Sequence, residues 1–425
     1  MSLTVFVTDG NDRPALAIVR ALGRRGATVI VGADTPVSLA SASRYCARHV
    51  MYPSPDRDRA GFERFLLDFV AREPVDVVLP VTDVTTHAVC LRQDAIRRHA
   101  AVAVPPLDAF DAVSDKGALL AQAARRGVPI PRTHFVPSIS HLPDIRDDVK
   151  YPAVIKPTRS RIPANGGWVR ADVHYAYSAD ELLQFYRSIP YLSSSPSLIQ
   201  ERIVGPGIGV FMLFDRGRLV CEFGHRRLRE KPPAGGVSVL RESTAVDPTA
   251  REHALHVFGD LPWHGVAMME FKQDSQTGKL YLMEVNGRFW GSLQLAIDAG
   301  MDFPFLACQL ALGRCPRVVP PYRTGIKSRW LLGDLDHLCL RLFKSDRDLH
   351  LPPLAPSRLR TVVEFLKLRQ RDMRYEVARL DDPGPFRHEL GNAVRSLSAA
   401  ASRRLFRSLL RTITDVSGPA IGHVQ

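Results

Sequence analysis

The stretch 268–292 has the clearest capacity for metal chemistry, because Glu270, Glu284, Asn286 and Arg288 lie there on two predicted strands joined by a polar turn. Side chains two apart on a strand share a face, so Glu284 and Asn286 point the same way. If the strands fold symmetrically about their turn, Glu270 lies opposite Glu284. Facing carboxylates repel each other, and a divalent cation between them removes the repulsion. Magnesium prefers oxygen ligands of this kind together with phosphate oxygens, so the spacing predicts a magnesium site.

The plainer interpretation of this stretch is a charged hairpin that faces solvent. Its neighbouring residues, among them Met269, Phe271 and Trp290, are too apolar for a solvent-facing hairpin. A register shift of one residue would place the two acids on opposite faces and remove the site. Arg288 shares the acidic face if the strand continues, and there its guanidinium could hold a phosphate oxygen.

Two further segments could bind a nucleotide, and neither is specific alone. Lys156 closes the apolar strand YPAVIKP and precedes a loop with Gly166 and Gly167, where small residues let backbone N–H groups approach phosphates. The plainer interpretation is a solvated lysine, since the loop lacks the GxxxxGK[ST] pattern of a P-loop. In LIQERI (198–203), the strand backbone could meet an adenine edge while Glu201 meets its amino group or the ribose. Without its neighbours, this segment is an ordinary edge strand.

A dense run of basic and small residues at 224–243 is the candidate site for a second, anionic substrate. The candidate substrate residues are His225, Arg227, Arg229, Gly235, Gly236 and Ser238. His225 is either a base or a side chain that ends a strand, and the second alternative is favoured. The GGVS run is equally compatible with a backbone anion nest and with an ordinary turn.

The elements that must position these residues fall into two patterns. Up to about residue 113, strands and helices alternate, which predicts a mostly parallel sheet with helices on both faces. Predicted strands cover 3–8, 27–32, 75–81 and 101–104, and predicted helices cover 14–26 and 62–71. The first turn, TDGNDRPA, lacks a GxGxxG fingerprint, so we interpret it as the start of the fold and not as a dinucleotide site.

Beyond a linking helix at 114–127, the pattern is α+β. Predicted strands cover 151–156, 198–203, 210–214, 219–223, 265–272 and 279–286, with helices at 178–187 and 249–258. The C-terminal part has a breaker-rich linker at 351–356 and amphipathic helices at 359–371 and 390–413. Five arginines and no acid lie between Arg395 and Arg411, which favours a solvated helix face over a membrane-surface helix.

The composition excludes several classes of protein. The 425 residues are 45% hydrophobic and 24% charged, which argues against disorder, and no apolar run is long enough to span a membrane. The net charge of +13 comes mostly from scattered arginine without aromatic-interleaved blocks, so we expect no nucleic-acid partner. Six cysteines without CxxC spacing predict neither a zinc site nor a redox pair. The start of the chain does not resemble a signal peptide, and we expect the protein in the cytoplasm.

Taken in order, these motifs resemble the ATP-grasp superfamily, in particular its carboxylate–amine and carboxylate–thiol ligases. The matching pieces are Asp115-Lys116 at the linking helix, Lys156 with its glycine loop, Gln200-Glu201, Glu270 and the run Glu284 to Arg288. The resemblance covers residues 3–330. It implies a Rossmann-like pre-ATP-grasp domain (1–113), a two-lobed ATP-grasp domain (114–330) and a basic helical C-terminal extension (331–425), an α/β and α+β architecture.

The resemblance also implies a role for each matching residue. Lys116 and Lys156 would hold ATP phosphates, while Gln200, Glu201 and the backbone of Arg202 and Ile203 would form the adenine hinge. Glu270 and Glu284 would hold magnesium or manganese, and Asn286 would complete the second ion. Arg288 and Lys156 would act on the transferred phosphoryl group. Two departures are Gly207, near where many members have an acidic residue for the ribose, and the loop 159–167, which has two arginines and few glycines.

The implied activity is ATP-dependent ligation, in which a small-molecule carboxylate becomes an acyl phosphate and an amine or other nucleophile attacks it. The leading alternative is a catalytically silent ATP-binding sensor or scaffold, suggested by Gly207 and the basic C-terminal part. A third alternative is a peripheral protein that binds anionic surfaces through the helix from Arg395 to Arg411. A dinucleotide-dependent oxidoreductase is disfavoured, because the sequence has no GxGxxG turn.

Overall fold

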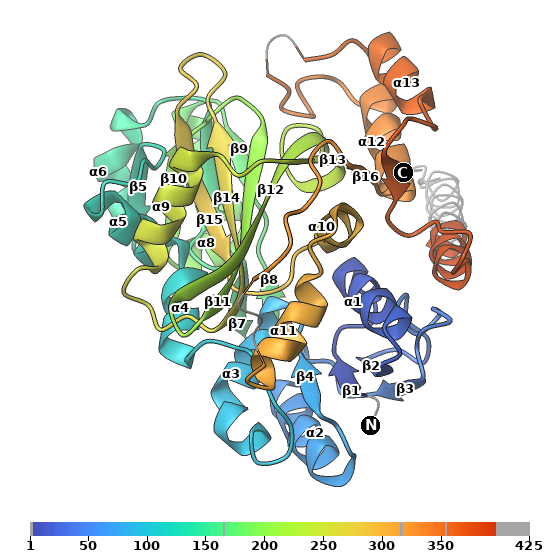
Figure 1. Cartoon of the computed structure of the whole chain (residues 1–425). Helices are drawn as coiled ribbons and strands as arrows, with labels where there is room; N and C mark the ends of the chain where they lie inside the picture. The colour runs from blue at the N-terminus through green and yellow to red at the C-terminus, as the bar shows by residue number, and fades with distance from the viewer. Residues whose placement is uncertain (1–2, 165, 315–317, 353–354, 397–425) are drawn as a thin grey trace, which may run out of the picture.

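The computed structural model describes residues 3–164, 166–314, 318–352 and 355–396. Its N-terminal part is a parallel sheet with strand order β3-β2-β1-β4 (Figure 1). The elements are β1 (Thr4–Val7), α1 (Arg13–Arg24), β2 (Thr28–Ala33), β3 (Arg48–Met51), α2 (Arg59–Arg72), β4 (Val77–Leu79) and α3 (Asp83–Ile96). Alternating side chains of the strands enter two separate cores, one with α2 and α3 and the other with α1. The predicted doubly covered parallel sheet is confirmed.

Two parts of this sheet differ from the sequence prediction. The segment predicted as a strand at 101–104 forms only a single bridge, between Ala101 and Val77. The β3 strand was not predicted, because its sequence RHVM lacks an apolar run and lies at the edge of the sheet. The α3 helix was not predicted either, although Thr82 and Thr85 cap its start reciprocally.

A second, antiparallel sheet follows two linking helices, α4 (Leu107–Ser114) and α5 (Lys116–Arg125). Its order is β5-β10-β6-β9. The elements of this lobe are β5 (Thr133–Val136), η1 (Ile139–His141), α6 (Leu142–Ile145), η2 (Arg146–Asp148), β6 (Ala153–Pro157), β9 (His174–Ala176), α7 (Ala179–Ser188), α8 (Pro190–Ser194) and β10 (Ser197–Glu201). The segment expected as a glycine loop is a short hairpin of β7 (Arg161–Ala164) and β8 (Gly167–Arg170).

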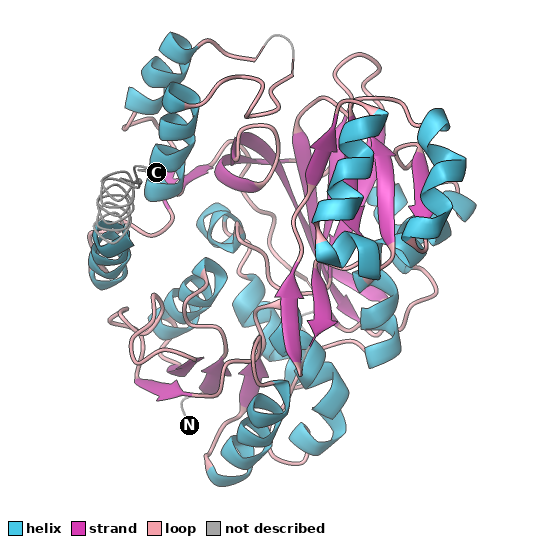
Figure 2. Ribbon diagram, turned by 180° about the vertical axis from the view of Figure 1, so that it is seen from behind, coloured by secondary structure: helices cyan, strands magenta, loops and turns pink. Residues whose placement is uncertain are grey.

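The third sheet has seven strands in the order β15-β14-β11-β12-β13-β16-β17. Figure 2 shows the strands of the molecule in magenta and the helices in cyan. Its strands are β11 (Gly207–Asp215), β12 (Arg218–Lys231), β13 (Val237–Thr244), β14 (Gly265–Gln273), β15 (Leu280–Asn286), β16 (Lys327–Arg329) and β17 (Met373–Tyr375). The helices are α9 (Pro248–Phe258), α10 (Leu293–Ala299) and α11 (Phe303–Ala311). One face of this sheet packs in the core with α9, and the other packs with α10 and α11. The sheet thereby joins the second lobe to the N-terminal part.

The hairpin of β14 and β15 brings the two acidic residues together in the predicted register. Glu270 pairs with Glu284, and Met268 pairs with Asn286. Beyond Glu270 the register shifts, so Phe271 pairs with Leu282 and Met283 is the extra residue. The symmetric register predicted from the turn therefore holds only at the end of the hairpin that carries the acids. A bulge bends the strand at this point.

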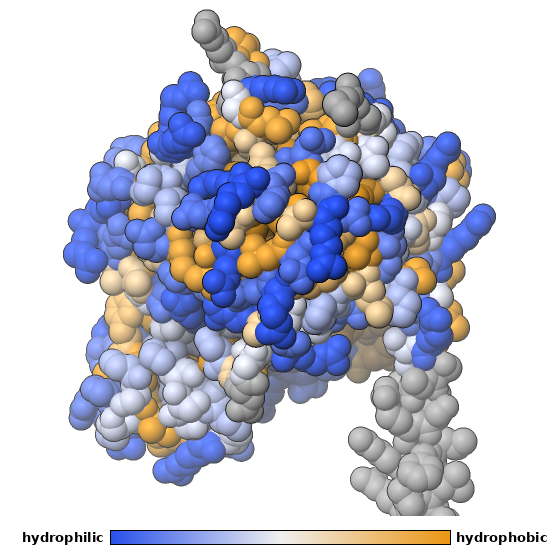
Figure 3. Space-filling model, turned by 90° about the horizontal axis from the view of Figure 1, so that it is seen from below, coloured by the Kyte–Doolittle hydropathy of each residue, from blue (hydrophilic) through white to orange (hydrophobic). Residues whose placement is uncertain are grey.

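The C-terminal part contains α12 (Leu331–Phe343), α13 (Arg358–Leu366) and a helix over 384–396 (Figure 1). The α13 helix is shorter than the predicted helix 359–371, and α12 was not predicted. Of the helix predicted over 390–413, and of the arginines from Arg395 to Arg411, residues 397 onward lie outside the described residues. Among the residues that the structure describes, no helix combines the length and apolar character that a membrane crossing requires. On the face seen from below, hydrophilic side chains lie among exposed apolar residues (Figure 3).

Candidate active site

The two carboxylates of the β14–β15 hairpin face ammonium groups that come from other elements. Lys116 is the first residue of α5, whose N-cap Asp115 accepts a hydrogen bond from the helix. Its ammonium lies 3.3 Å from Glu284 and donates to Ser160 at 2.6 Å. Lys156, on β6 of the second sheet, is 7% exposed, and its ammonium has no hydrogen-bond or ion-pair partner within the described ranges. Burying a cation without a partner costs free energy, so an anion bound next to Lys156 would be stabilising.

The pKa values of the two acids shift in opposite directions because their surroundings differ. Burial raises the pKa of Glu284, but the ammonium groups of Lys116 and Lys156 outweigh burial and lower it to about 2. Burial raises the pKa of Glu270, and Arg227 opposes this shift. Burial also lowers the pKa of Lys156 to about 8, against the attraction of Glu284. Glu284 is therefore ionised at neutral pH, and Lys156 is still mostly protonated.

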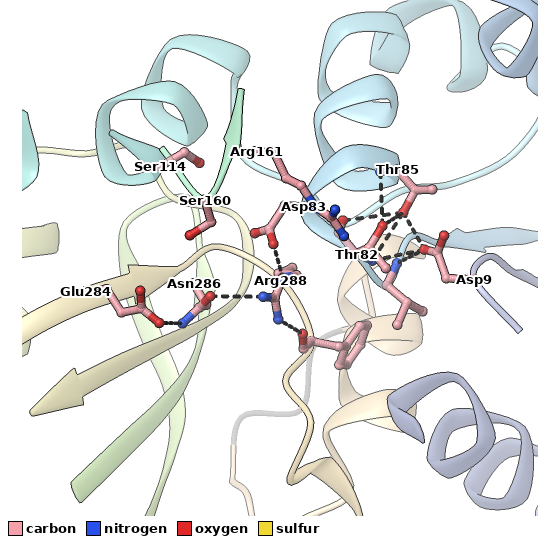
Figure 4. A network of polar contacts seen from close by, with 12 residues as sticks. Asp9, Thr82, Asp83, Thr85, Ser114, Ser160, Arg161, Glu284, Asn286 and Arg288 are labelled. Carbon is pink, nitrogen blue, oxygen red and sulfur yellow. Dashed lines mark hydrogen bonds and ion pairs between the residues drawn. The ribbon is translucent and has the colours of Figure 1, made fainter. Parts of the chain in front are cut away.

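Arg288 connects this cleft to the N-terminal sheet (Figure 4). Its guanidinium donates to the Asn286 side-chain oxygen at 3.1 Å and lies 2.9 Å from Asp83, the first residue of α3. Asn286 in turn donates to Glu284 at 3.2 Å. Burial lowers the pKa of Arg288, but Asp83 and Glu284 raise it above its ordinary value. Glu284, Asn286 and Arg288 thus form one connected row, in the order in which they follow along the chain.

The hinge segment has a free backbone edge. Gln200 is buried within the second sheet and donates to Thr133 at 2.8 Å. One carboxylate oxygen of Glu201 accepts from the Arg132 backbone at 2.8 Å, so part of this side chain serves the fold. The backbone groups of Arg202 and Ile203 carry no hydrogen bond within the described part of the chain. This edge can meet a planar heterocycle such as adenine.

Arg227 lies beside the acidic pair. Its guanidinium contacts Glu270 and donates to Glu230 at 2.8 Å. Gly207 makes room for this side chain, since a Cβ at position 207 would lie 2.8 Å from Cδ of Arg227. The departure at Gly207 therefore allows an arginine to reach Glu270.

The structure separates the remaining candidate substrate residues from the cleft. His225 is 1% exposed and stands edge-on to Phe211 in the core, where burial lowers its pKa well below the ordinary value. Arg229 pairs with the buried Asp334 of α12 at 2.6 Å. Ser238 is buried and donates to the backbone of its own strand. The segment 224–243 forms most of a long strand pair, and the contacts of these three side chains lie within the fold.

The turn of this strand pair, unlike His225, Arg229 and Ser238, lies next to Arg227 and the second lobe. Gly235 and Gly236 lie between β12 and β13, and the Gly236 carbonyl accepts from Arg227 at 3.0 Å. A Cβ added at Gly235 would lie 3.6 Å from the hydroxyl of Tyr175 on the opposite lobe. The turn therefore reaches across the cleft and contacts the second lobe.

Sequence reasoning missed Asp83 and Arg161 at this site, and it placed Ser160 in the phosphate loop without a partner. Asp83 pairs with Arg288, Ser160 accepts from Lys116, and Arg161 lines the same cleft. Asp83 follows the capping residue Thr82, so a start signal for α3 was present in the sequence. Ser160 and Arg161 fall in the predicted phosphate loop but had no assigned partner.

The donor set fits a hard divalent cation. Glu270 and Glu284 offer carboxylate oxygens on adjacent strands, and both contact cationic side chains. Asn286 offers an amide oxygen. No cluster of three or more His, Cys, Asp or Glu side chains occurs in the described residues, so phosphate oxygens would have to complete the shell. Magnesium binds in this way, through one or two carboxylates and substrate phosphates.

Comparison with known proteins agrees with this geometry. Residues 193–333 match a family model described as ATP-grasp in the biosynthetic pathway with Ter operon. No curated protein sequence matches the chain. Among solved structures, an L-amino acid ligase from Bacillus licheniformis is similar, with a TM-score of 0.57 and 18% identity over 76% of this chain and 78% of that chain.

Two more solved structures share the fold. The ADP complex of N5-carboxyaminoimidazole ribonucleotide synthetase has a TM-score of 0.59 and 12% identity over 77% of this chain and 80% of that chain. The biotin carboxylase domain of 2-oxoglutarate carboxylase from Hydrogenobacter thermophilus, with MgADP and bicarbonate, has a TM-score of 0.59 and 16% identity over 77% and 73%. Residues 193–333 are therefore similar to an ATP-grasp family model, and the chain shares the fold of these solved structures.

Proposed function

We propose that this protein is an ATP- and magnesium-dependent ligase that activates a small-molecule carboxylate as an acyl phosphate. The observation that carries the proposal is the buried cluster of charges in which Lys116 and Lys156 face the Glu270–Glu284 pair. Similar folds occur in an L-amino acid ligase and in a biotin carboxylase domain with MgADP and bicarbonate, which supports this class of reaction.

In the first step, a carboxylate oxygen of the substrate attacks the γ-phosphorus of ATP, the bond to the β–γ bridging oxygen breaks, and ADP leaves. Lys116 and Lys156 neutralise negative charge on the phosphate oxygens, and Arg288 holds the transferred group. Magnesium, held by Glu270, Glu284 and Asn286 when bound, would supply further charge neutralisation on those oxygens.

In the second step, the nitrogen of an amine attacks the acyl carbon, and inorganic phosphate leaves with the electron pair of the broken C–O bond. The amine loses one proton as the amide forms. Arg227, which is held by Glu230 and Glu270, lies where it can stabilise the departing phosphate. We infer that the product is an amide, in which a new carbon–nitrogen bond joins the two substrates.

The test is release of ADP and phosphate with a panel of carboxylates and amines, together with hydroxylamine to trap the acyl phosphate as a hydroxamate. Glu284→Gln removes the charge from the carboxylate that faces both lysines, and we expect a loss of at least about 100-fold in turnover. Glu222→Gln is the matched control, because Glu222 lies on the same sheet but pairs with Arg251 of α9 at 2.8 Å. Turnover that survives Glu284→Gln would refute the mechanism, and tight ATP binding without turnover would favour a silent sensor.

A further inference from the structure

A cleft lies between the N-terminal part and the end of β15, where Asn286 is located. It is walled by the starts of α3 and α5, the end of α4, the β7–β8 hairpin and the end of β15. Its polar end contains Lys116, Ser160 and Asn286, which already belong to the network around Glu284. A substrate in this cleft would therefore present one end directly to the proposed site of phosphoryl transfer.

Another part of the lining is apolar and aromatic. Val84 and His87 of α3, Phe110 of α4 and Trp168 of β8 line it. The His87 ring stands edge-on to Trp168, with ring centroids 5.6 Å apart. Nδ1 of His87 and Nε1 of Trp168 are buried and have no hydrogen-bond partner within the described ranges, so this wall combines ring carbons with two unpaired nitrogen atoms. Such a wall favours an apolar or aromatic group, and a heteroaromatic ring would also pair with the nitrogen atoms.

Close contact with the N-terminal part fixes the position of Trp168. The Trp168 backbone donates to the carbonyl of Asp56 at 2.7 Å. A Cβ at Gly167 would lie 2.3 Å from that same carbonyl, so only glycine allows this approach. The Trp168 ring also lies 5.7 Å from the guanidinium of Arg59 on α2. The aromatic wall is therefore assembled from two separate parts of the fold.

The arginines at the edge of the cleft are already paired. Arg159 lies 3.0 Å from Asp111 and 3.6 Å from Asp115, and Arg161 lies 3.5 Å from Asp56. A second carboxylate on the substrate would compete with these acids for the guanidinium groups. The pairing therefore disfavours dicarboxylates and leaves a single negative charge, at the polar end, as the preferred form.

We propose that this cleft binds the carboxylate substrate, and that the substrate is a monocarboxylate whose apolar or aromatic group packs against Val84, Phe110 and Trp168. This inference rests on the proposed ligase function, because the carboxylate end must reach Lys116 and Asn286. It narrows the substrate class to amphiphilic acids with one negative charge.

The first experiment measures ADP release at saturating MgATP with size-matched acids: aromatic and branched aliphatic monocarboxylates, polar monocarboxylates and dicarboxylates. We expect kcat/KM to be at least about tenfold higher for the aromatic and branched acids. Trp168→Ala is expected to raise KM for these acids about tenfold and to leave KM for ATP within about twofold, and Trp168→Phe to restore most of the affinity. Val169→Ala is the matched control, since Val169 is the next residue on β8 and is 43% exposed.

The second experiment measures binding of the same acids by isothermal titration in the presence of MgADP, which does not depend on turnover. Binding of apolar acids that Trp168→Ala weakens would support the inference even if no acid stimulates ADP release, in which case the ligase function fails alone. Turnover or binding that favours polar acids or dicarboxylates, or that Trp168→Ala leaves unchanged, would overturn the inference while the ligase function stands. Absence of both turnover and binding would overturn both.

Discussion

At the scale of single residues, the site is an arrangement of opposite charges removed from water. Glu284 keeps its charge because two ammonium groups face it, and Lys156 keeps an unpaired charge that its burial disfavours. Both groups gain when an anion and a cation enter together. This arrangement suits the proposed binding of a nucleotide together with its metal.

The lowered pKa of Lys156 predicts how nucleotide affinity depends on pH. Below its pKa of about 8 the ammonium is charged and attracts phosphate; above it the group becomes neutral and binding must take up a proton. We expect the Kd for MgATP to rise about tenfold from pH 7 to pH 9, with proton uptake measurable by titration in buffers of different ionisation enthalpy.

Lys156→Arg is the control for this dependence, because a guanidinium stays protonated across that range. Its Kd should be flat between pH 7 and pH 9, whatever its absolute value. A wild-type Kd that is equally flat would show that Lys156 does not contact the nucleotide.

At the scale of elements, pattern and register were predictable in some places and not in others. Apolar strand segments and the cap Ser178 of α7 were visible in the sequence. The bulge at Met283 was not, because turn length alone does not fix register, and its placement beyond Glu270 preserved the predicted acidic pair. The strands that continue through 224–243 were not predicted, because charged residues interrupt the period-two pattern there.

The start of α3, which presents Asp83 to Arg288, depends on Asp9 (Figure 4). The Asp9 carboxylate accepts hydrogen bonds from the hydroxyl of Thr85 at 2.5 Å, the hydroxyl of Thr8 at 2.7 Å and the backbone of Thr82 at 2.9 Å. Asp9→Ala would leave these buried donors without an acceptor and would place alanine at a φ of +58°. We expect the free energy of unfolding to fall by about 2–4 kcal/mol, measured by denaturant titration.

Asp9→Asn separates the contribution of the full set of hydrogen bonds from that of the left-handed backbone at residue 9. Asparagine tolerates the left-handed backbone and keeps one acceptor oxygen, so its cost should be clearly smaller than that of alanine. Equal stability of Asp9→Ala and the wild type would show that this network does not hold α3.

At the scale of the whole molecule, the C-terminal part joins the other parts of the chain. Glu376, next to β17, lies 2.7 Å from Arg13 of α1 and also contacts Arg241 of β13. Asp382 pairs with Arg20 of α1 at 2.7 Å, and both side chains are almost fully buried. The N-terminal sheet and the seven-stranded sheet are therefore linked by buried ion pairs as well as by apolar packing.

Two neighbouring aspartates provide a matched test of this linkage. Asp382→Ala would leave the Arg20 guanidinium buried and without its carboxylate, which we expect to cost about 3–5 kcal/mol of unfolding free energy. Asp381→Ala removes an exposed pair with Arg24 and should cost at most about 1 kcal/mol. Similar losses for the two variants, in parallel thermal and denaturant unfolding, would contradict a structural role for the buried pair.

Most of the fold class and the central charged residues could be predicted, because strand–helix alternation and the acidic hairpin are local patterns. Partnerships between distant residues could not: Asp83 with Arg288, Arg229 with Asp334 and Arg20 with Asp382 depend on how sheets and helices come together. For the same reason, the sequence did not show that Arg229, a predicted substrate residue, pairs with Asp334. The same dependence explains why the aromatic cleft around Trp168 was not visible in the sequence.

The most direct test of the central claim is metal and nucleotide binding at the cleft, measured by electron paramagnetic resonance of Mn²⁺ titrated with ADP. The wild type and Glu222→Gln should bind Mn²⁺ in an ADP-dependent manner, whereas Glu284→Gln should weaken that binding by at least about tenfold while its circular dichroism spectrum stays unchanged. Equal Mn²⁺–ADP binding by Glu284→Gln and the wild type, or no binding by either, would contradict the account.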